Sequence, residues 1–328
     1  MKIWFDITNT PHVLFFRPII KDLEKNGHEI IITTRNHSQT VDMLKYYNLN
    51  YTIVGSHNGK SKIKKAFGLI TRSNDLKKHL KNKKIDAVIT HQSPYGMIAG
   101  FLLKIPKRMF IFDNETAKFQ NLAGMNFATH LIAPKYLAKE KMFGKPINKY
   151  SSLKESLYLA ESETRENPFK KRYILVRPEP WSAAYYNENN NDHLMNLIDD
   201  IKKSGIDYDI VVIPRDQIQK KAYKKRFDEN IIIPEKALDG ATLVKNASLV
   251  IGAGGTMNRE AVVLGTPVIS MYSGHMLIVD KYLTEKNVMI HNKNPTLEDV
   301  KDALRSKKYS PLLEEGLKSR KEIVGMVA

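Results

Sequence analysis

Short apolar runs alternate with amphipathic stretches along the first half of the chain. The segment after Pro11 carries apolar residues from Phe16 to Leu23 at the i, i+3, i+4, i+7 spacing that buries one face of a helix. The pattern predicts strands at Lys2–Ile7, Glu29–Thr34, Tyr51–Val54, Ile85–Thr90, Arg108–Phe112 and Thr129–Ala133. Strands that alternate with helices indicate a parallel sheet covered by helices on both faces.

The second half repeats this alternation. Strands are expected at Tyr173–Arg177, Asp209–Pro214, Asn230–Ile233, Ser248–Gly252, Pro267–Met271 and Val288–Ile290. The polar stretch Ser151–Lys171 between the halves reads as a linker. We therefore predict an α/β protein with two Rossmann-like, doubly wound domains that face each other across a cleft. The expected domains are residues 1–155 and 170–310, with a helix over 311–328 that can cross back to the first domain.

Length and composition fit this prediction. The 328 residues suit two domains of about 150 residues each. The absence of cysteine excludes disulfides, thiol nucleophiles and cysteine-bound metals. No apolar run approaches the roughly 20 residues of a membrane span. Met1–Asp6 reads as the start of a strand, so we expect no signal peptide. We expect a cytoplasmic protein.

The formal net charge of +17 attracts phosphates, anionic lipid or nucleic acid, but the basic residues are spread along the whole chain. The segment Lys60–Lys84 contains ten Lys and Arg against one acid and carries apolar residues at helical spacing. It can lie on an anionic membrane as a peripheral contact at the inner face. The more ordinary alternative is a surface helix whose apolar stripe packs on the sheet.

The clearest chemical signal lies in the second half, where the run Ser248–Gly252 ends in Ala253-Gly254-Gly255-Thr256 and a helix follows at once. Glycines let a backbone approach a ligand and adopt positive φ. Free N–H groups and the positive end of the helix dipole would then face a phosphate. We expect Gly254, Gly255 and Thr256 to bind phosphate, with Thr256 either capping the helix or donating to a phosphate oxygen.

Glu260 lies one helical turn after Thr256. Four helical residues rise about 6 Å, which is comparable to the offset between a diphosphate and its ribose. A carboxylate at that place can accept hydrogen bonds from both ribose hydroxyls. The alternative is a tight strand–helix turn with a solvated Glu260. A binding site is favoured by the combination of the strand, the glycines, Thr256, Glu260 and the following Gly265-Thr266-Pro267.

This segment resembles the nucleotide-binding stretch of GT-B glycosyltransferases, above all the N-acetylglucosaminyltransferase that makes the lipid-linked peptidoglycan precursor. It is also similar to that of the related UDP-N-acetylglucosamine 2-epimerases. The resemblance implies a GT-B fold, a UDP-linked sugar as the donor substrate, the diphosphate at Gly254–Thr256 and the ribose at Glu260. The whole chain resembles a largely uncharacterised, mostly archaeal family through the blocks Asp6–Val13, Val212–Arg215 and Gly254–Met257.

A histidine follows the first strand. Thr10 is a good N-cap and Pro11 a good first helical residue, which places His12 in the first turn of a helix. The positive helix end disfavours imidazolium, so His12 is expected to be neutral near pH 7 and able to accept a proton from an acceptor hydroxyl. In the peptidoglycan enzyme this loop is glycine-rich and also ends in histidine. The alternative is a histidine that caps or packs locally.

Two acids follow the fifth strand. Asp113 or Glu115 could act as a base, or they could form an N-cap with a first-turn acid. The run His91–Gly96 follows the fourth strand and is expected to shape the acceptor side.

Three further candidates lie in the second half. Arg177 and Arg215 follow its first two strands and could each neutralise diphosphate charge, although exposed arginines are common. His275 follows the strand after the phosphate loop, where the resemblance implies a contact with the donor sugar; the alternative is a helix-start residue.

Other site types find little support. Asp207-Tyr208-Asp209 has the spacing of metal-dependent transferases but precedes an apolar strand, and no His/Asp cluster has metal-ligand spacing. We therefore expect a metal-independent enzyme without a cofactor. There is no Walker loop or nucleophile elbow, and the scattered aromatic residues give no reason to expect specific nucleic-acid binding.

Three hypotheses remain. The first is a glycosyltransferase in which His12, Asp113 or Glu115 removes the proton of an unknown acceptor, lipid-linked or glycan. The second is a UDP-sugar 2-epimerase, although the basic-acidic opening associated with those epimerases is absent. The third is a non-catalytic binder of anionic ligands, driven by charge, which would not require the glycines and Glu260.

Overall fold

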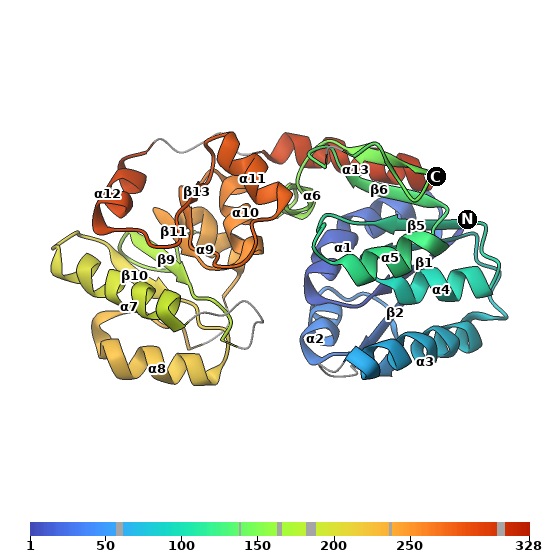
Figure 1. Ribbon diagram of the computed structural model, residues 1–328, viewed down its shortest axis with the longest axis horizontal. Coiled ribbons are helices and arrows are strands. Elements are labelled where there is room, and N and C mark those ends of the chain that lie inside the picture. Colours follow the sequence, from blue (N-terminus) through green and yellow to red (C-terminus); the bar gives the residue numbers. More distant parts are fainter. Residues whose placement is uncertain (57–61, 138, 163–165, 182–187, 236–237, 307–311) are drawn as a thin grey trace. The chain divides into compact units, whose positions relative to one another are not determined.

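The computed structural model describes residues 1–56, 62–137, 139–162, 166–181, 188–235, 238–306 and 312–328. The chain divides into two compact units (Figure 1). Unit 1 comprises Met1–Tyr158 and Leu317–Ala328, and unit 2 comprises Leu159–Gly316. Among the helices within these ranges, none is long and apolar enough to cross a membrane.

Unit 1 is built on an eight-stranded sheet with the order β3-β2-β1-β4-β5-β6-β8-β7. All neighbouring strands are parallel except β7, which runs antiparallel to β8. The strands are β1 (Lys2–Ile7), β2 (Glu29–Asn36), β3 (Thr52–Ser56), β4 (Ala87–His91), β5 (Lys107–Ile111), β6 (His130–Pro134), β7 (Lys141–Met142) and β8 (Lys145–Tyr150). The carboxyl ends of β1, β4 and β5 meet at one edge, where ligands of such sheets bind.

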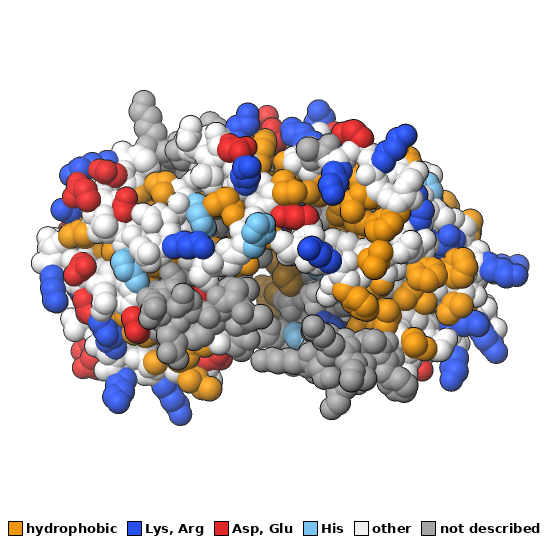
Figure 2. Space-filling view, viewed as in Figure 1, with side chains coloured by type: hydrophobic (Ala, Val, Ile, Leu, Met, Phe, Trp, Pro, Cys, Tyr) orange, Lys and Arg blue, Asp and Glu red, His pale blue; other side chains and the backbone are white. Residues whose placement is uncertain are grey.

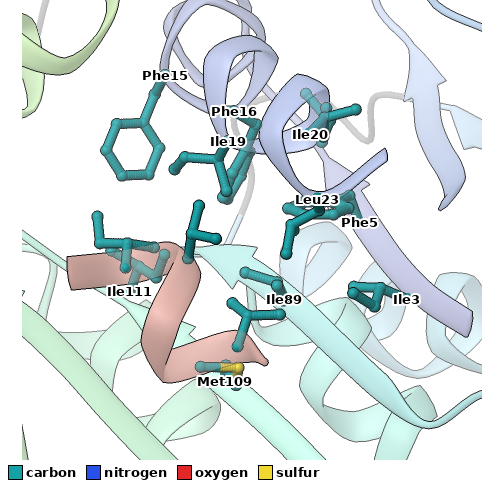
Figure 3. Packing of buried hydrophobic residues seen from close by; sticks show 14 of the residues in the cluster. Ile3, Phe5, Phe15, Phe16, Ile19, Ile20, Leu23, Ile89, Met109 and Ile111 are labelled. Carbon is teal, nitrogen blue, oxygen red and sulfur yellow. The ribbon is translucent and has the colours of Figure 1, made fainter. Parts of the chain in front are cut away.

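Helices cover both faces of this sheet because β1 is apolar on both sides. Ile3 and Phe5 pack with α1 in one buried cluster (Figure 3), whereas Trp4 packs in a second cluster on the opposite face. The first cluster also takes residues of α13, and the second takes residues of α3, α4 and α5. The helices are α1 (Thr10–Lys25), α2 (Ser38–Tyr46), α3 (Lys62–Leu80), α4 (Pro94–Leu102), α5 (Lys118–Phe127), α6 (Lys154–Leu159) and α13 (Leu313–Val327).

Unit 2 is built on a five-stranded parallel sheet with the order β10-β9-β11-β12-β13. The strands are β9 (Tyr173–Arg177), β10 (Asp209–Val212), β11 (Leu249–Gly252), β12 (Val268–Ser270) and β13 (Ile290–His291). The helices are α7 (Glu188–Lys203), α8 (Gln217–Phe227), α9 (Gly240–Asn246), α10 (Gly255–Leu264), α11 (Ile278–Glu285) and α12 (Leu297–Arg305), with a 3-10 turn at Asp228–Asn230. Residues of α7, α8 and α12 pack with the sheet in one cluster.

The predicted α/β class with doubly wound parallel sheets is confirmed, and several details are corrected. The expected strand Asn230–Ile233 is wrong, because this segment contributes only an isolated bridge from Ile232 to Val211. Strands β7 and β8 were not expected, since Lys145–Tyr150 is polar and contains a proline. The expected linker Ser151–Lys171 begins instead with the helix α6, which buries Leu157 in unit 1.

Within the basic stretch Lys60–Lys84, helix α3 covers Lys62–Leu80, and its C-terminal half packs on the sheet. Leu76 and Leu80 of the predicted stripe are fully buried beside Trp4. The side chains of Ile63 and Phe67 lie outside the described residues. Ile70, which belongs to the same predicted pattern, is 64% exposed, and Leu69 is partly buried, so the described part of the pattern is core at Leu76 and Leu80 and surface at Ile70.

Candidate functional site

The turn from β11 into α10 contains Gly254, Gly255 and Thr256, the residues expected to bind phosphate, and is called the phosphate loop. Gly254 is the N-cap of α10, with no side-chain hydrogen bond to the first turn. Thr256 is the second residue of the helix, so the expectation that it could cap the helix is wrong. Since no side chain at the N-cap position bonds to the first turn, the first N–H groups of α10 can donate to another acceptor.

Close packing explains the glycines of this turn. The backbone of Gly254 is extended (φ −155°), so positive φ is not the reason for glycine there. A Cβ atom on Gly254 would lie 2.5 Å from Nη2 of Arg215, and one on Gly255 would lie 3.0 Å from Nη2 of Arg259. The loop therefore rests directly on two guanidinium groups.

Arg177 and Arg215 meet beside this loop. Arg177 ends β9, and its Nη1 donates to the carbonyl oxygens of Ile213 at 2.7 Å and Pro214 at 2.8 Å. Arg215 Nε donates to the carbonyl oxygen of Pro178 at 3.0 Å. These bonds tie the loops after β9 and β10 together, so both cations are held at the carboxyl ends of the strands.

Charge accumulates at this edge of the sheet. The pKa of Arg177 is lowered to about 9, mainly by burial and next by the neighbouring Arg215 charge. The Glu260 carboxylate partly opposes this fall in the pKa. Glu260 is half-buried and lies one turn into α10. Unit 2 thus brings together Gly254, Gly255, Arg177, Arg215 and Glu260, an arrangement that can bind a diphosphate and, at the carboxylate, a hydroxyl donor.

The loop after β12 contacts the same edge at Glu179, a residue that the sequence did not single out. The hydroxyl of Ser273 donates a short hydrogen bond to Oε1 of Glu179, which is buried two residues after β9. His275 is exposed in this loop, three residues before α11. No hydrogen bond joins the His275 side chain to the arginines among the residues that the structure describes. Glu179 could have been found from its position directly after Arg177-Pro178.

A buried ion pair packs against the phosphate loop. Arg259 in α10 donates from Nε to Oδ1 of Asp280 at 2.9 Å and from Nη2 to Oδ2 at 3.1 Å. Both side chains are almost completely buried. Since this guanidinium lies under Gly255, Asp280 of α11 fixes the cation on which the loop rests.

In unit 1, His12 lies in the first turn of α1 as expected, although the N-cap is Asn9 rather than Thr10. His12 is buried, and its ring centroid lies 4.7 Å from that of His91, the last residue of β4. Nε2 of His91 lies 3.5 Å from Oδ1 of Asp113. Three polar side chains that follow different strands therefore form one cluster.

Lys154 completes this cluster. Its Nζ lies 2.7 Å from Oδ2 of Asp113, so a buried carboxylate is neutralised by an ammonium group from α6. Lys154 was not predicted because it falls in the expected linker. No feature of the sequence places it near Asp113.

Both histidines of the cluster are neutral at pH 7. Burial, followed by the neighbouring His91 and Lys154, holds the pKa of His12 well below its usual range. Burial lowers the pKa of His91 to about 4, with Asp113 opposing the shift. The predicted neutrality of His12 agrees with this direction, but burial is the leading cause rather than the helix dipole.

The acids 113–115 do not cap a helix. Oδ1 of Asn114 accepts from the backbone N–H of Thr116 at 2.9 Å, and α5 starts later, with Ala117 as its N-cap. Asp113 points into the cluster with Lys154, whereas Glu115 is half-buried. No group of three or more His, Asp or Glu side chains suited to a metal ion occurs within the described part of the chain.

Comparisons with known proteins place the fold. The family model described as "Protein of unknown function (DUF354)" matches residues 1–324. An uncharacterized protein of Methanocaldococcus jannaschii, MJ0665, is 33% identical over 309 residues, covering 90% of this chain and 88% of that protein. The UDP-N-acetylglucosamine 2-epimerase of the same organism is 23% identical over 317 residues and covers 83% of both chains.

Two kinds of solved structure share the fold. The Methanocaldococcus jannaschii UDP-GlcNAc 2-epimerase in complex with UDP-GlcNAc and UDP has a TM-score of 0.76 at 18% identity, covering 100% of this chain and 99% of that chain. The spinosyn rhamnosyltransferase SpnG, complexed with spinosyn aglycone, has a TM-score of 0.65 at 11% identity, covering 99% and 97%. The chain therefore has the GT-B fold that these epimerases and a glycosyltransferase share.

Proposed function

The chain belongs to the family described as "Protein of unknown function (DUF354)", and from this premise we propose that it is an enzyme that binds a nucleoside-diphosphate sugar, UDP-linked, in unit 2. The observation that carries the proposal is the convergence of Arg177, Arg215 and the uncapped start of α10 at one sheet edge, with Glu260 beside them. Two cations and the first N–H groups of α10 match a diphosphate, and a carboxylate one turn away matches ribose hydroxyls.

The proposed reaction is transfer of the sugar to a hydroxyl acceptor without a metal ion. The N–H groups of α10 and the two arginines would stabilise the departing diphosphate. His12 would accept the acceptor proton, since a neutral imidazole is the form that can do so. Asp113 suits this role less well, because its Oδ2 already pairs with the Lys154 ammonium at 2.7 Å.

Epimerisation at C2 of a UDP-sugar is the second candidate. It is supported by the epimerase likeness, which spans 83% of both chains in sequence and nearly all of both chains in structure. This reaction would need a base at a carbon-bound hydrogen, for which Glu115, half-buried and two residues after Asp113, is the candidate.

The binding test is calorimetric titration with UDP and UDP-N-acetylglucosamine. Arg215→Met and Glu260→Ala are each expected to weaken affinity about 10-fold or more, because each removes one charge-assisted contact. Lys220→Met, on a helix of the same unit, is the matched control and should bind like the wild type. Unchanged affinity in both site variants would refute the assignment.

The reaction test uses UDP-N-acetylglucosamine in deuterated water. A 2-epimerase exchanges the C2 hydrogen for deuterium and forms the epimer without any acceptor. A transferase retains the C2 hydrogen and releases UDP only when a hydroxyl acceptor, or slowly water, receives the sugar. Exchange at C2 would replace the transfer proposal with epimerisation.

A further inference from the structure

Two neighbouring helices of unit 1 expose large apolar side chains. Phe101 and Leu102 of α4 are 51% and 39% exposed, and Phe119 and Leu122 of α5 are 53% and 51% exposed. The two helices pack against each other, and the rings of Phe101 and Phe127 lie 5.3 Å apart. Figure 2 shows the corresponding apolar surface in the region where Figure 1 labels α4 and α5. These four residues define the α4–α5 face.

Core packing does not explain this face, because both helices already bury a different side. Met97 of α4 and Met125 of α5 are fully buried in the core cluster that includes Trp4. A surface helix normally carries polar residues opposite its buried stripe. A group of exposed apolar side chains on packed helices is typical of an interaction surface.

The charge around the face selects the kind of partner. Neither Pro94–Leu102 nor Lys118–Phe127 contains an acidic residue. Lys118 immediately precedes Phe119, and Lys104 is two residues beyond Leu102; both lysines are exposed. Apolar anchors bordered by lysines, whose stems can extend along an apolar surface, match the acyl chains and phosphates of an anionic lipid surface.

A second copy of the chain fits this face less well. Each copy carries a formal net charge of +17, and a twofold contact would place the same lysine-bordered surfaces against each other. Like charges brought together at a contact oppose association.

We propose that the α4–α5 face docks on anionic membrane. The docking would hold unit 1, with His12 and its cluster, at the lipid surface. It uses residues outside the nucleotide site, so it can be tested whether or not the proposed reaction is correct. It also differs from the stretch Lys60–Lys84, where Leu76 and Leu80 are buried.

The experiment is sedimentation of the full chain with vesicles of phosphatidylcholine alone or mixed with phosphatidylglycerol. We expect binding to the mixed vesicles, little binding to the neutral ones, and weakening at high salt. The double substitution F119S/L122S should lower affinity about tenfold or more, because two apolar anchors lose their place among the acyl chains. Its melting temperature should match the wild type, since both residues are exposed.

Ile218→Ser provides the matched control. Ile218 is 71% exposed on the lysine-rich helix α8, so it tests whether any exposed apolar residue near lysines would serve. This variant should bind like the wild type. The proposal is overturned if the wild type does not sediment with mixed vesicles or if F119S/L122S binds them equally well. It is also overturned if the wild type is a dimer that F119S/L122S dissociates, because a second copy would then occupy the face.

Discussion

Gly254 and Arg215 show how one residue depends on another at the phosphate loop. The glycine is extended and could carry a side chain as far as its backbone is concerned, yet a Cβ atom would meet the guanidinium at 2.5 Å. The contacted atom is the far end of a flexible side chain, so the chain can relieve the contact by moving Arg215. The cost of a larger residue would then appear in binding rather than in folding.

We therefore expect Gly254→Ala to lower UDP affinity about tenfold, or about 1.4 kcal/mol, with little change in melting temperature. Calorimetric titration and thermal unfolding measure the two effects. Gly240→Ala is the control, because a Cβ atom on Gly240 meets nothing within 4 Å. Equal UDP affinity in the Gly254 variant and the control would mean that Arg215 does not contact the nucleotide.

His91 makes a second prediction at the residue scale. Its pKa falls from 6.5 to about 4 on folding, so the unfolded chain binds more protons between these values. The free energy of unfolding should therefore be highest above pH 6.5 and fall as the pH drops toward 4, by about 3 kcal/mol from this residue. Chemical unfolding across this range should show a shallower loss in His91→Gln than in the wild type. Identical slopes would contradict the buried neutral state.

At the scale of elements, α10 and α11 are joined beneath the phosphate loop by the buried pair of Arg259 and Asp280. Such a pair contributes little when compared with apolar packing, but the loss of one partner leaves an uncompensated buried charge. The same helix α11 also carries Lys281 and Glu285, an exposed pair 3.8 Å apart. Because Asp280 and Glu285 both lie on α11, the effect of burial on the cost of losing an ion-pair partner can be compared within one helix.

Asp280→Asn is expected to lower the free energy of unfolding by about 3 kcal/mol or more. Glu285→Gln, the matched control, should change it by less than about 0.5 kcal/mol, because exposed pairs are screened by water and salt. Denaturant titration of both variants measures the difference. Similar values for the two would show that the Arg259 guanidinium is solvated.

At the scale of the whole molecule, the chain passes between its two units twice, after Tyr158 and after Gly316. Helix α13 begins in unit 2 and continues into unit 1, where Ile323 and Val327 join the main cluster. Glu322 accepts hydrogen bonds from the backbone N–H and the hydroxyl of Ser151 at 2.7 and 2.6 Å. The end of the chain is thus part of the core of unit 1.

Glu322→Ala should therefore destabilise unit 1 by about 1–2 kcal/mol, because two charge-assisted hydrogen bonds are lost. Lys321→Ala, which changes an exposed neighbour, should alter stability by no more than about 0.5 kcal/mol. Hydrogen exchange of amides in β1 and α1 reports on unit 1 directly. Unchanged protection in Glu322→Ala would mean that the two hydrogen bonds to Ser151 do not stabilise unit 1.

The sequence by itself determined the elements that local pattern controls. The β1 boundaries, the strand–helix alternation and the turn at Gly254 follow from side-chain periodicity and glycine chemistry, which act over a few residues. It also singled out Arg177 and Arg215 as separate candidates from their positions after strands, and Glu260 from its place one helical turn after Thr256. The polar strand β8 escaped prediction because pairing with β6, rather than its own pattern, makes it a strand.

Only the tertiary structure decided which of these residues meet. Lys154 reaches Asp113 across 40 intervening sequence positions, and Asp280 reaches Arg259 from the next helix. Burial, which shifts the pKa of His12 and His91, is likewise a property of the packed core. Sequence spacing carries no information about such contacts, because long-range packing sets both distance and desolvation.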